Sequence, residues 1–174
     1  MFERLLRLIA SRWFRLVLVV FIVLSLQTTL FSEVRPFGYA IQLVAIFVAS
    51  AGSVHDVRTG AIVGLVSGLM FDAVLATPLG ISALVLGAVG AGAALMLRSF
   101  RDPPWWLRLL AVSVAAACGE LLMPLTQAVV GQGGWLGLRV ISAMSVTFIG
   151  ALLIASLFIP VTRWTLREKV LLGN

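Results

Sequence analysis

Long apolar runs recur along the whole sequence and constrain the fold more than any other feature. Of the 174 residues, 61% are hydrophobic and 11% are charged, whereas a soluble domain carries about 25% charged residues. A run of about 18 or more apolar residues is long enough to cross a bilayer as a helix. The sequence therefore predicts an all-α, polytopic membrane protein with a single integral membrane domain over residues 1–174.

Polar breaks and prolines divide the apolar runs into six expected spans, which would form a six-helix bundle. Residues 1–13, before the first span, combine arginines with one apolar helical face, which is typical of a basic amphipathic lead-in at the membrane surface. A signal peptide is the competing interpretation, but the apolar run is too long and further spans follow it. The expected spans are residues 14–31, 37–54, 59–76, 79–97, 107–130 and 136–161.

The basic residues predict how the bundle is oriented. Eleven of them fall on the side that holds both termini, and two, Arg35 and Arg139, fall on the other side. Because cytoplasmic loops carry the excess of Lys and Arg, we expect both termini in the cytoplasm and the protein in the inner membrane. The net charge of +6 then indicates orientation and contact with anionic lipids rather than nucleic acid. The eleven residues are Arg4, Arg7, Arg12, Arg15, Arg58, Arg98, Arg101, Arg108, Arg163, Arg167 and Lys169.

Glycine recurs at every fourth position of the expected third span, and the series ends at an acid. Gly60, Gly64, Gly68 and Asp72 form one stripe of a helix, because four residues advance about 400°. Small residues allow close backbone contact, which holds helices together where lipid provides no hydrophobic force. The stripe is therefore expected to face protein. It could be ordinary packing, with the third and fourth spans forming a tight hairpin, or it could line a polar seam or partner groove.

Two charged residues are expected a short way inside the outer ends of their spans. Asp72 and Arg139 lie at similar depth, and we hypothesise that they pair. A charge within a span costs about 2.5–3.5 kcal/mol unless a partner or water relieves it. Arg35 is the alternative partner for Asp72.

A second acid, Glu120, is expected deeper, about 15 Å from the outer end of the fifth span at 1.5 Å per residue. Gln127 lies on the same face, and Pro124 cannot donate to the carbonyl of Glu120, so polar groups gather at one depth. Three interpretations remain open: a protonated structural acid, a contact to a partner helix, and a proton or solute site.

Residues able to catalyse a reaction are sparse. The only cysteine, Cys118, excludes an internal disulfide, and the only histidine, His55, lies with Asp56 in an expected turn, where polar residues fall by default. We find no nucleophile–base arrangement, phosphate loop or metal-ligand spacing. The sequence therefore predicts no enzyme, no cofactor and no metal.

The glycine series continues into a turn that resembles a known family. The run Gly60-x3-Gly64-x3-Gly68-Leu69-x2-Asp72, followed by Thr77-Pro78-Leu79-Gly80, is similar to that of MreD, the rod shape-determining membrane protein of bacteria. The resemblance implies that these positions form a helix-packing or partner motif without a catalytic role. The positions carried over are Gly60, Gly64, Gly68, Asp72, Pro78 and Gly80.

The resemblance also implies a function and its partners. A member would be a non-enzymatic component of the cell-wall elongation complex that binds MreC, together with RodA and its class B penicillin-binding protein, and indirectly the MreB filament. The family is similar in architecture to the substrate-binding subunits (S-components) of energy-coupling-factor (ECF) vitamin transporters. The alternative function is therefore small-solute binding, with a pocket lined by Asp72, Glu120, Gln127 and Arg139.

Overall fold

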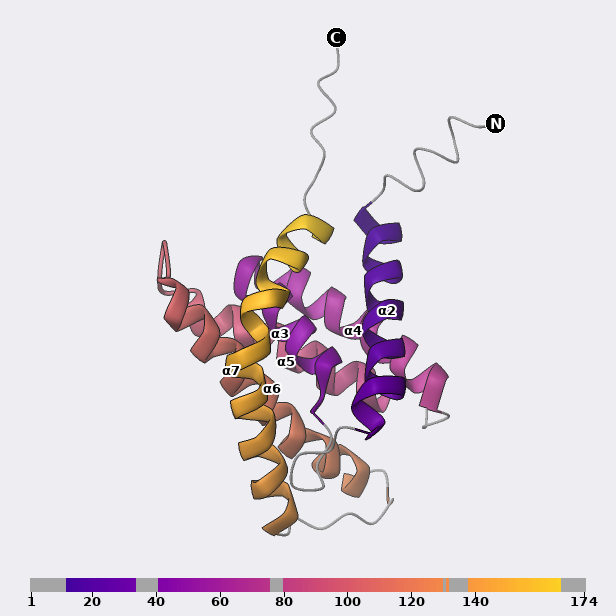
Figure 1. Ribbon diagram of the computed structural model, residues 1–174. Helices are drawn as coiled ribbons and strands as arrows, with labels where there is room; N and C mark the ends of the chain where they lie inside the picture. Colours follow the sequence, from indigo (N-terminus) through magenta and orange to yellow (C-terminus); the bar gives the residue numbers. More distant parts are fainter. Residues whose placement is uncertain (1–11, 34–40, 76–79, 130, 132–137, 167–174) are drawn as a thin grey trace, which may run out of the picture.

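The described residues form a bundle of six α-helices. The computed structural model describes residues 12–33, 41–75, 80–129, 131 and 138–166, and within these residues there is no strand, so the all-α prediction is confirmed (Figure 1). Most of the expected lead-in, residues 1–11, lies outside the described part. The helices are α2 (Arg12–Glu33), α3 (Leu43–Val54), α4 (Val57–Leu75), α5 (Ile81–Leu97), α6 (Trp105–Val129) and α7 (Leu138–Leu166).

The helices differ in whether they are long enough to cross a membrane. Four of them, α2, α4, α6 and α7, are long and apolar enough to do so, while α5 has 17 residues and α3 has 12. The expected second span, residues 37–54, is helical in the described part only from Leu43, because Ile41 and Gln42 precede the helix. At 1.5 Å per residue α3 is about 18 Å long, against about 30 Å of hydrocarbon.

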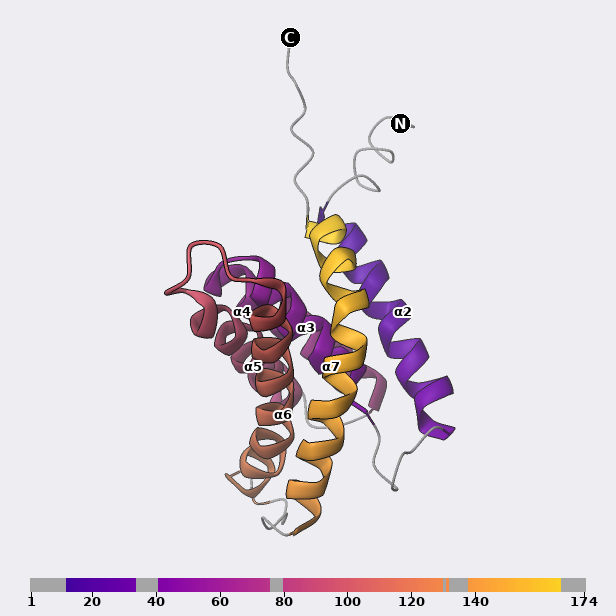
Figure 2. The same cartoon turned by 60° about the vertical axis from the view of Figure 1, so that its left-hand side comes forward.

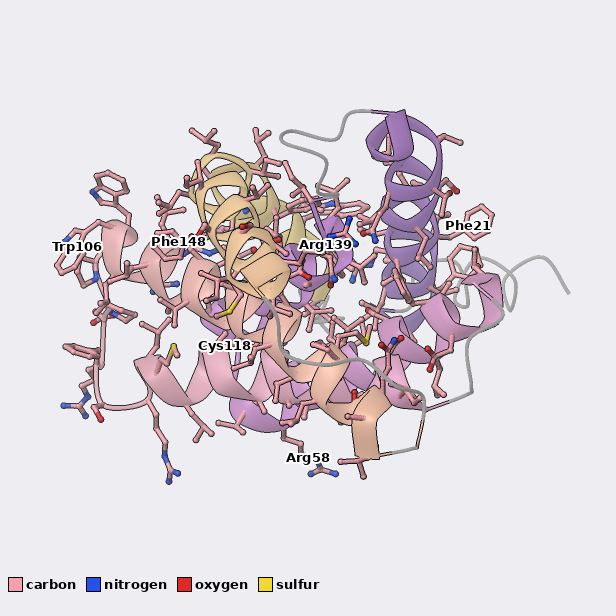
Figure 3. The ribbon with its side chains drawn as sticks, turned by 90° about the horizontal axis from the view of Figure 1, so that it is seen from below. Phe21, Arg58, Trp106, Cys118, Arg139 and Phe148 are labelled. Atoms are coloured by element: carbon pink, nitrogen blue, oxygen red, sulfur yellow. The ribbon has the colours of Figure 1, made fainter. Side chains whose placement is uncertain are left out.

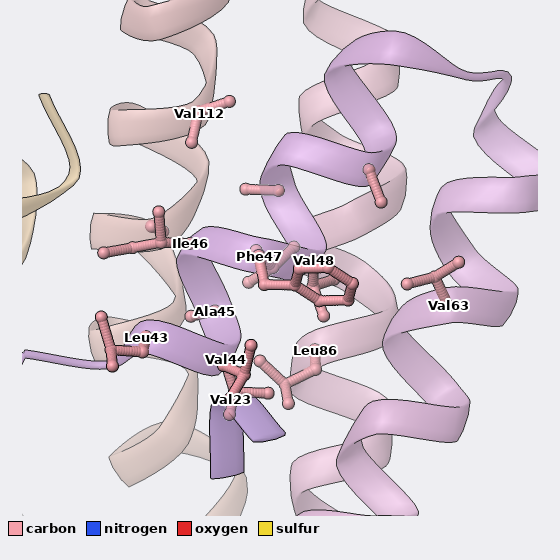
Figure 4. Packing of buried hydrophobic residues seen from close by; sticks show 14 of the residues in the cluster. Val23, Leu43, Val44, Ala45, Ile46, Phe47, Val48, Val63, Leu86 and Val112 are labelled. Atoms are coloured by element: carbon pink, nitrogen blue, oxygen red, sulfur yellow. The ribbon is translucent and has the colours of Figure 1, made fainter. Parts of the chain in front are cut away.

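The short helix α3 lies at the centre of the bundle. Every residue from Leu43 to Ser53 is buried, and α3 packs against each of the other five helices. Phe47 is fully buried and meets the ring of Phe158 in α7 edge to face, with the ring centroids 5.9 Å apart. Figure 4 shows the surrounding side chains, Val63 and Leu86 among them. A helix that is apolar on all sides must be buried, and here protein rather than lipid covers α3.

The other helices are arranged mainly as two pairs. The most extensive contacts join α4 to α5 and α6 to α7. The α4–α5 pair crosses α2 and α7 at a steep angle, as Figures 1 and 2 both show. The start of α2 and the end of α7 lie at the same end of the bundle, where Arg15 Nη1 donates a hydrogen bond to the carbonyl of Trp164 at 3.0 Å.

The outer surface of the bundle is apolar. Large hydrophobic side chains are exposed along α2 and α7, and Phe21 and Trp106 point outward in Figure 3. In a membrane such side chains contact lipid or a partner helix, so their exposure is consistent with the span-forming lengths of these helices.

Candidate functional site

The glycine stripe of α4 faces α5. A Cβ atom at Gly64 would overlap the carbonyl oxygen of Leu86, and one at Gly68 would overlap the backbone of Ala83. At Gly60 the overlapped group is the carbonyl of Gly90. Each glycine therefore permits a backbone contact that any side chain would prevent, and packing within this one chain accounts for all three.

Asp72 holds the start of α5 in the position where this stripe ends. It is buried, and its carboxylate accepts hydrogen bonds from the backbone N–H of Gly80 at 2.8 Å and of Ser82 at 3.3 Å. The first N–H groups of a helix have no partner within the helix and attract negative charge. Gly80 has φ +106°, a conformation that favours glycine, and it has no side chain to cap α5 itself. The Asp72 carboxylate serves as the cap instead.

The structure does not bring Arg139 to Asp72. Arg139 is exposed at the start of α7, and α7 packs chiefly against α6, α3 and α2 rather than against α4 (Figure 3). The hypothesis of an Asp72–Arg139 pair is therefore wrong. The Asp72 carboxylate instead accepts hydrogen bonds from backbone N–H groups at the start of α5. The alternative partner Arg35 lies outside the described residues, as does Pro78.

Glu120 is the centre of a polar cluster that joins three helices. Its Oε1 accepts a hydrogen bond from the Thr147 hydroxyl of α7 at 2.7 Å, and its Oε2 accepts one from Nε2 of Gln42 at 3.1 Å. Gln42 immediately precedes α3, so the acid also lies near the positive end of that helix dipole. The cluster places polar side chains where the chain enters α3 inside the bundle.

A further side chain completes the start of α3. Gln27 of α2 accepts a hydrogen bond from the backbone N–H of Val44 at 3.0 Å and so caps α3 from a neighbouring helix. Neither Gln27 nor Thr147 is identifiable from the sequence, in which each is only a polar residue within an apolar run. Gln127, which was singled out, is half-buried on α6 beyond Pro124, and α6 continues through that proline.

Arginines gather at the opposite end of the bundle from Arg139. Three cavities of about 570, 670 and 340 Å³ lie there, and none of them is lined by Asp72, Glu120, Gln127 or Arg139. Within the described residues no group of three His, Cys, Asp or Glu side chains could hold a metal ion. The described arginines of this end are Arg12, Arg15, Arg58, Arg98, Arg101, Arg108 and Arg163.

The turn between α3 and α4 carries the only histidine of the chain at this same end. Burial lowers the pKa of His55 below its ordinary value, and Asp56 and the backbone of Thr162 partly oppose the shift. The Thr59 hydroxyl donates a hydrogen bond to Asp56 and lowers the pKa of that carboxyl. The adjacent acid and base therefore have separate partners, which disfavours an acid–base pair.

Comparison with known proteins identifies a family. A family model described as rod shape-determining protein MreD matches residues 7–164, which is nearly the whole chain. No curated protein and no solved structure matches it.

Proposed function

The chain belongs to the MreD family of rod shape-determining membrane proteins, and we propose on this basis that it is a non-enzymatic component of the cell-wall elongation complex. In this role it binds MreC and helps to assemble or regulate the peptidoglycan synthesis machinery. The family match over residues 7–164 carries the proposal, since the family is one of shape-determining structural proteins rather than of enzymes.

The proposed orientation places both termini and the arginine-rich end in the cytoplasm, with six passes through the inner membrane. The Arg15–Trp164 contact supports a shared side for the two ends of the bundle, and the arginines favour the cytoplasmic side. The short helix α3 is compatible with six passes because neighbouring helices, not lipid, surround it. Contact with anionic lipids would follow from this orientation.

Partner binding is then mainly helix against helix. The connections on the outer side are short, residues 34–42, 76–80 and 130–137, and Gln42 of the first one lies inside the bundle against Glu120, which leaves little surface outside the membrane. MreC would be the direct partner, with RodA, its class B penicillin-binding protein and, indirectly, MreB in the same complex.

We propose the face of α7 that points away from the bundle as the surface that binds a transmembrane helix of MreC. Four exposed residues, Ser142, Ser145, Ile149 and Leu152, follow one another at spacings of three, four and three. This is the spacing of a helix–helix seam, and serine in such a seam allows the close approach of a second helix. We refer to these four residues as the α7 stripe.

Purification of the tagged protein from native membranes in mild detergent tests the proposed function. Mass spectrometry of the sample should identify MreC and other elongation proteins, without a stoichiometric small molecule. Recovery of a transporter ATPase pair or a vitamin-like compound would instead support the solute-binding alternative. That alternative has less structural support, since Gln42 and Thr147 already occupy Glu120.

A photo-crosslinking amino acid tests the α7 stripe separately. Ile149 lies on the stripe and is 59% exposed, while Leu84 on α5 is 67% exposed and serves as the matched control. We expect MreC to crosslink at least fivefold more from position 149 than from position 84. Equal yields would reject the stripe as the docking face without affecting the family assignment.

A further inference from the structure

A groove lies between the start of α6 and the end of α7, beside the arginine-rich end. Its volume is about 340 Å³, within the range of roughly 300–1,000 Å³ typical of ligand sites. Its walls combine two arginines with apolar side chains. The lining residues are Trp105, Arg108 and Leu109 from α6 and Ser156, Ile159 and Arg163 from α7, together with Pro103.

The groove carries positive charge that no acid in its lining balances. Nε of Arg108 donates a hydrogen bond to the carbonyl of Pro103 at 3.2 Å, which holds the guanidinium in place and leaves its two Nη groups for another acceptor. Arg163 is exposed on the opposite wall. Two arginines that line one space can bind a phosphate, which each guanidinium can contact through two N–H groups.

The rest of the lining fits the remainder of a phospholipid. Leu109 and Ile159 provide apolar walls, and Trp105, 74% exposed, has the amphipathic ring that is enriched at the level of lipid headgroups. Farther along α7, Leu153 and Leu157 expose an apolar surface that acyl chains can cover.

A proline adds a hydrogen-bond acceptor beside the groove. Pro160 lies inside α7 and has no N–H, so it cannot donate to the carbonyl of Ser156, which is a lining residue. A headgroup that carries hydroxyl donors next to its phosphate would satisfy this carbonyl as well as the arginines. Glycerol is such a headgroup.

We propose that this groove binds the headgroup of an anionic phospholipid of the phosphatidylglycerol type, with Arg108 and Arg163 on its phosphate. The site rests on the proposed orientation, in which the arginine-rich end meets the anionic cytoplasmic leaflet. The site differs from a diffuse attraction of that end to the membrane, because lipid binding depends on the guanidinium groups of Arg108 and Arg163 and not on those of the neighbouring arginines.

Native mass spectrometry of the purified full chain with added phosphatidylglycerol tests the site. The double variant Arg108→Gln/Arg163→Gln should lose at least tenfold in apparent affinity. The matched control, Arg58→Gln/Arg101→Gln, removes the same charge from the same end at two residues that do not line the groove, and should lose no more than twofold. Phosphatidylethanolamine, which has no net charge, should bind the wild type at least fivefold more weakly.

Several outcomes would overturn the site. Equal losses in the two double variants would show diffuse electrostatic attraction, and equal binding of the two lipids would show that the groove does not select an anion. Arg163→Gln alone avoids any disturbance of the Arg108–Pro103 contact and should still lose at least threefold. MreC recovery from native membranes is measured independently, so failure of the lipid site and failure of the proposed function are distinguishable.

Discussion

The two helix pairs of the bundle are held together by different physical means. Between α4 and α5, Gly60, Gly64 and Gly68 allow the backbones to touch. Between α6 and α7, a hydrogen bond from Thr147 to Glu120 joins the helices, and each helix contains an internal proline. The α4–α5 contact depends on glycines having no side chain, whereas the α6–α7 contact depends on the chemical identity of particular side chains.

This difference determines what each pair tolerates. An added methyl group has no space at the α4–α5 contact, because a backbone carbonyl cannot move aside without breaking its helix. At the α6–α7 contact, polar groups can rearrange or find other partners within the membrane, which keeps the net value of such a hydrogen bond small. We therefore expect steric changes in the first pair to cost more than polar deletions in the second.

The largest effect is expected at Gly64. Gly64→Val places a branched side chain against the carbonyl of Leu86 and should lower the free energy of unfolding by about 3 kcal/mol. Unfolding in mixed SDS–detergent micelles measures the change. Gly92 is the matched control, because a Cβ atom there has nothing within 4 Å, and Gly92→Ala should stabilise the helix by up to about 1 kcal/mol. Equal effects at the two positions would mean that close packing does not hold the α4–α5 pair together.

The next effect is expected at the end of the same pair. Asp72→Ala leaves the N–H groups of Gly80 and Ser82 without their acceptor, and buried donors left unpaired cost about 1–3 kcal/mol. Asp72→Asn keeps one acceptor oxygen and should lose less than half as much in the same unfolding assay. Asp102→Ala, at an exposed acid of the α5–α6 loop, should change the stability by no more than about 0.5 kcal/mol. A loss at Asp102 as large as that at Asp72 would refute the capping role.

The two pairs also differ in how far the sequence predicts them. Glycines every four residues have a helical period, so their common face was readable from spacing alone. The partners of Asp72 could not be predicted in this way. They are backbone N–H groups eight and ten residues later, and nearly every residue has a backbone N–H group, so the sequence does not distinguish these two. Matching depth in the expected spans instead selected Arg139, an opposite charge at a similar depth.

Glu120 shows the same limit for side chains. Its depth and the nearby proline identified a polar site, but its two donors come from positions 78 residues before it and 27 residues after it. Such contacts depend on how the helices rotate in the bundle, which an apolar run does not specify. The late start of α3 was missed for a related reason: residues 37–54 are nearly all apolar, and only the contacts of Gln42 and Gln27 show why the helix begins at Leu43.

A smaller effect is expected at the α6–α7 contact. A double-mutant cycle of Glu120→Ala and Thr147→Val isolates the hydrogen bond between these side chains, and its coupling energy should be about 0.6 kcal/mol. Glu120→Ala alone should cost more, because it also leaves Gln42 without an acceptor. A coupling energy above the loss at Gly64 would reverse the proposed ranking of the two pairs.

The smallest effect is expected where the two regions meet, at the turn between α3 and α4. His55 lies against the backbone of Thr162 in α7, and burial lowers its pKa from the ordinary value of 6.5. Below pH 6.5 the unfolded chain therefore binds a proton that the folded chain does not, so stability is full above pH 6.5 and falls as the pH decreases toward the folded pKa. The neighbouring Asp56 has a lowered pKa and stays ionised in this range, while Arg163 disfavours protonation of His55.

Unfolding measured between pH 7.5 and pH 5.5, roughly one unit on either side of an ordinary His pKa, should show this loss of stability in the wild type and a weaker loss in His55→Gln. An unchanged pH dependence in the variant would mean that the imidazole is solvated in the folded bundle, and that this turn does not join the glycine-packed pair to α7.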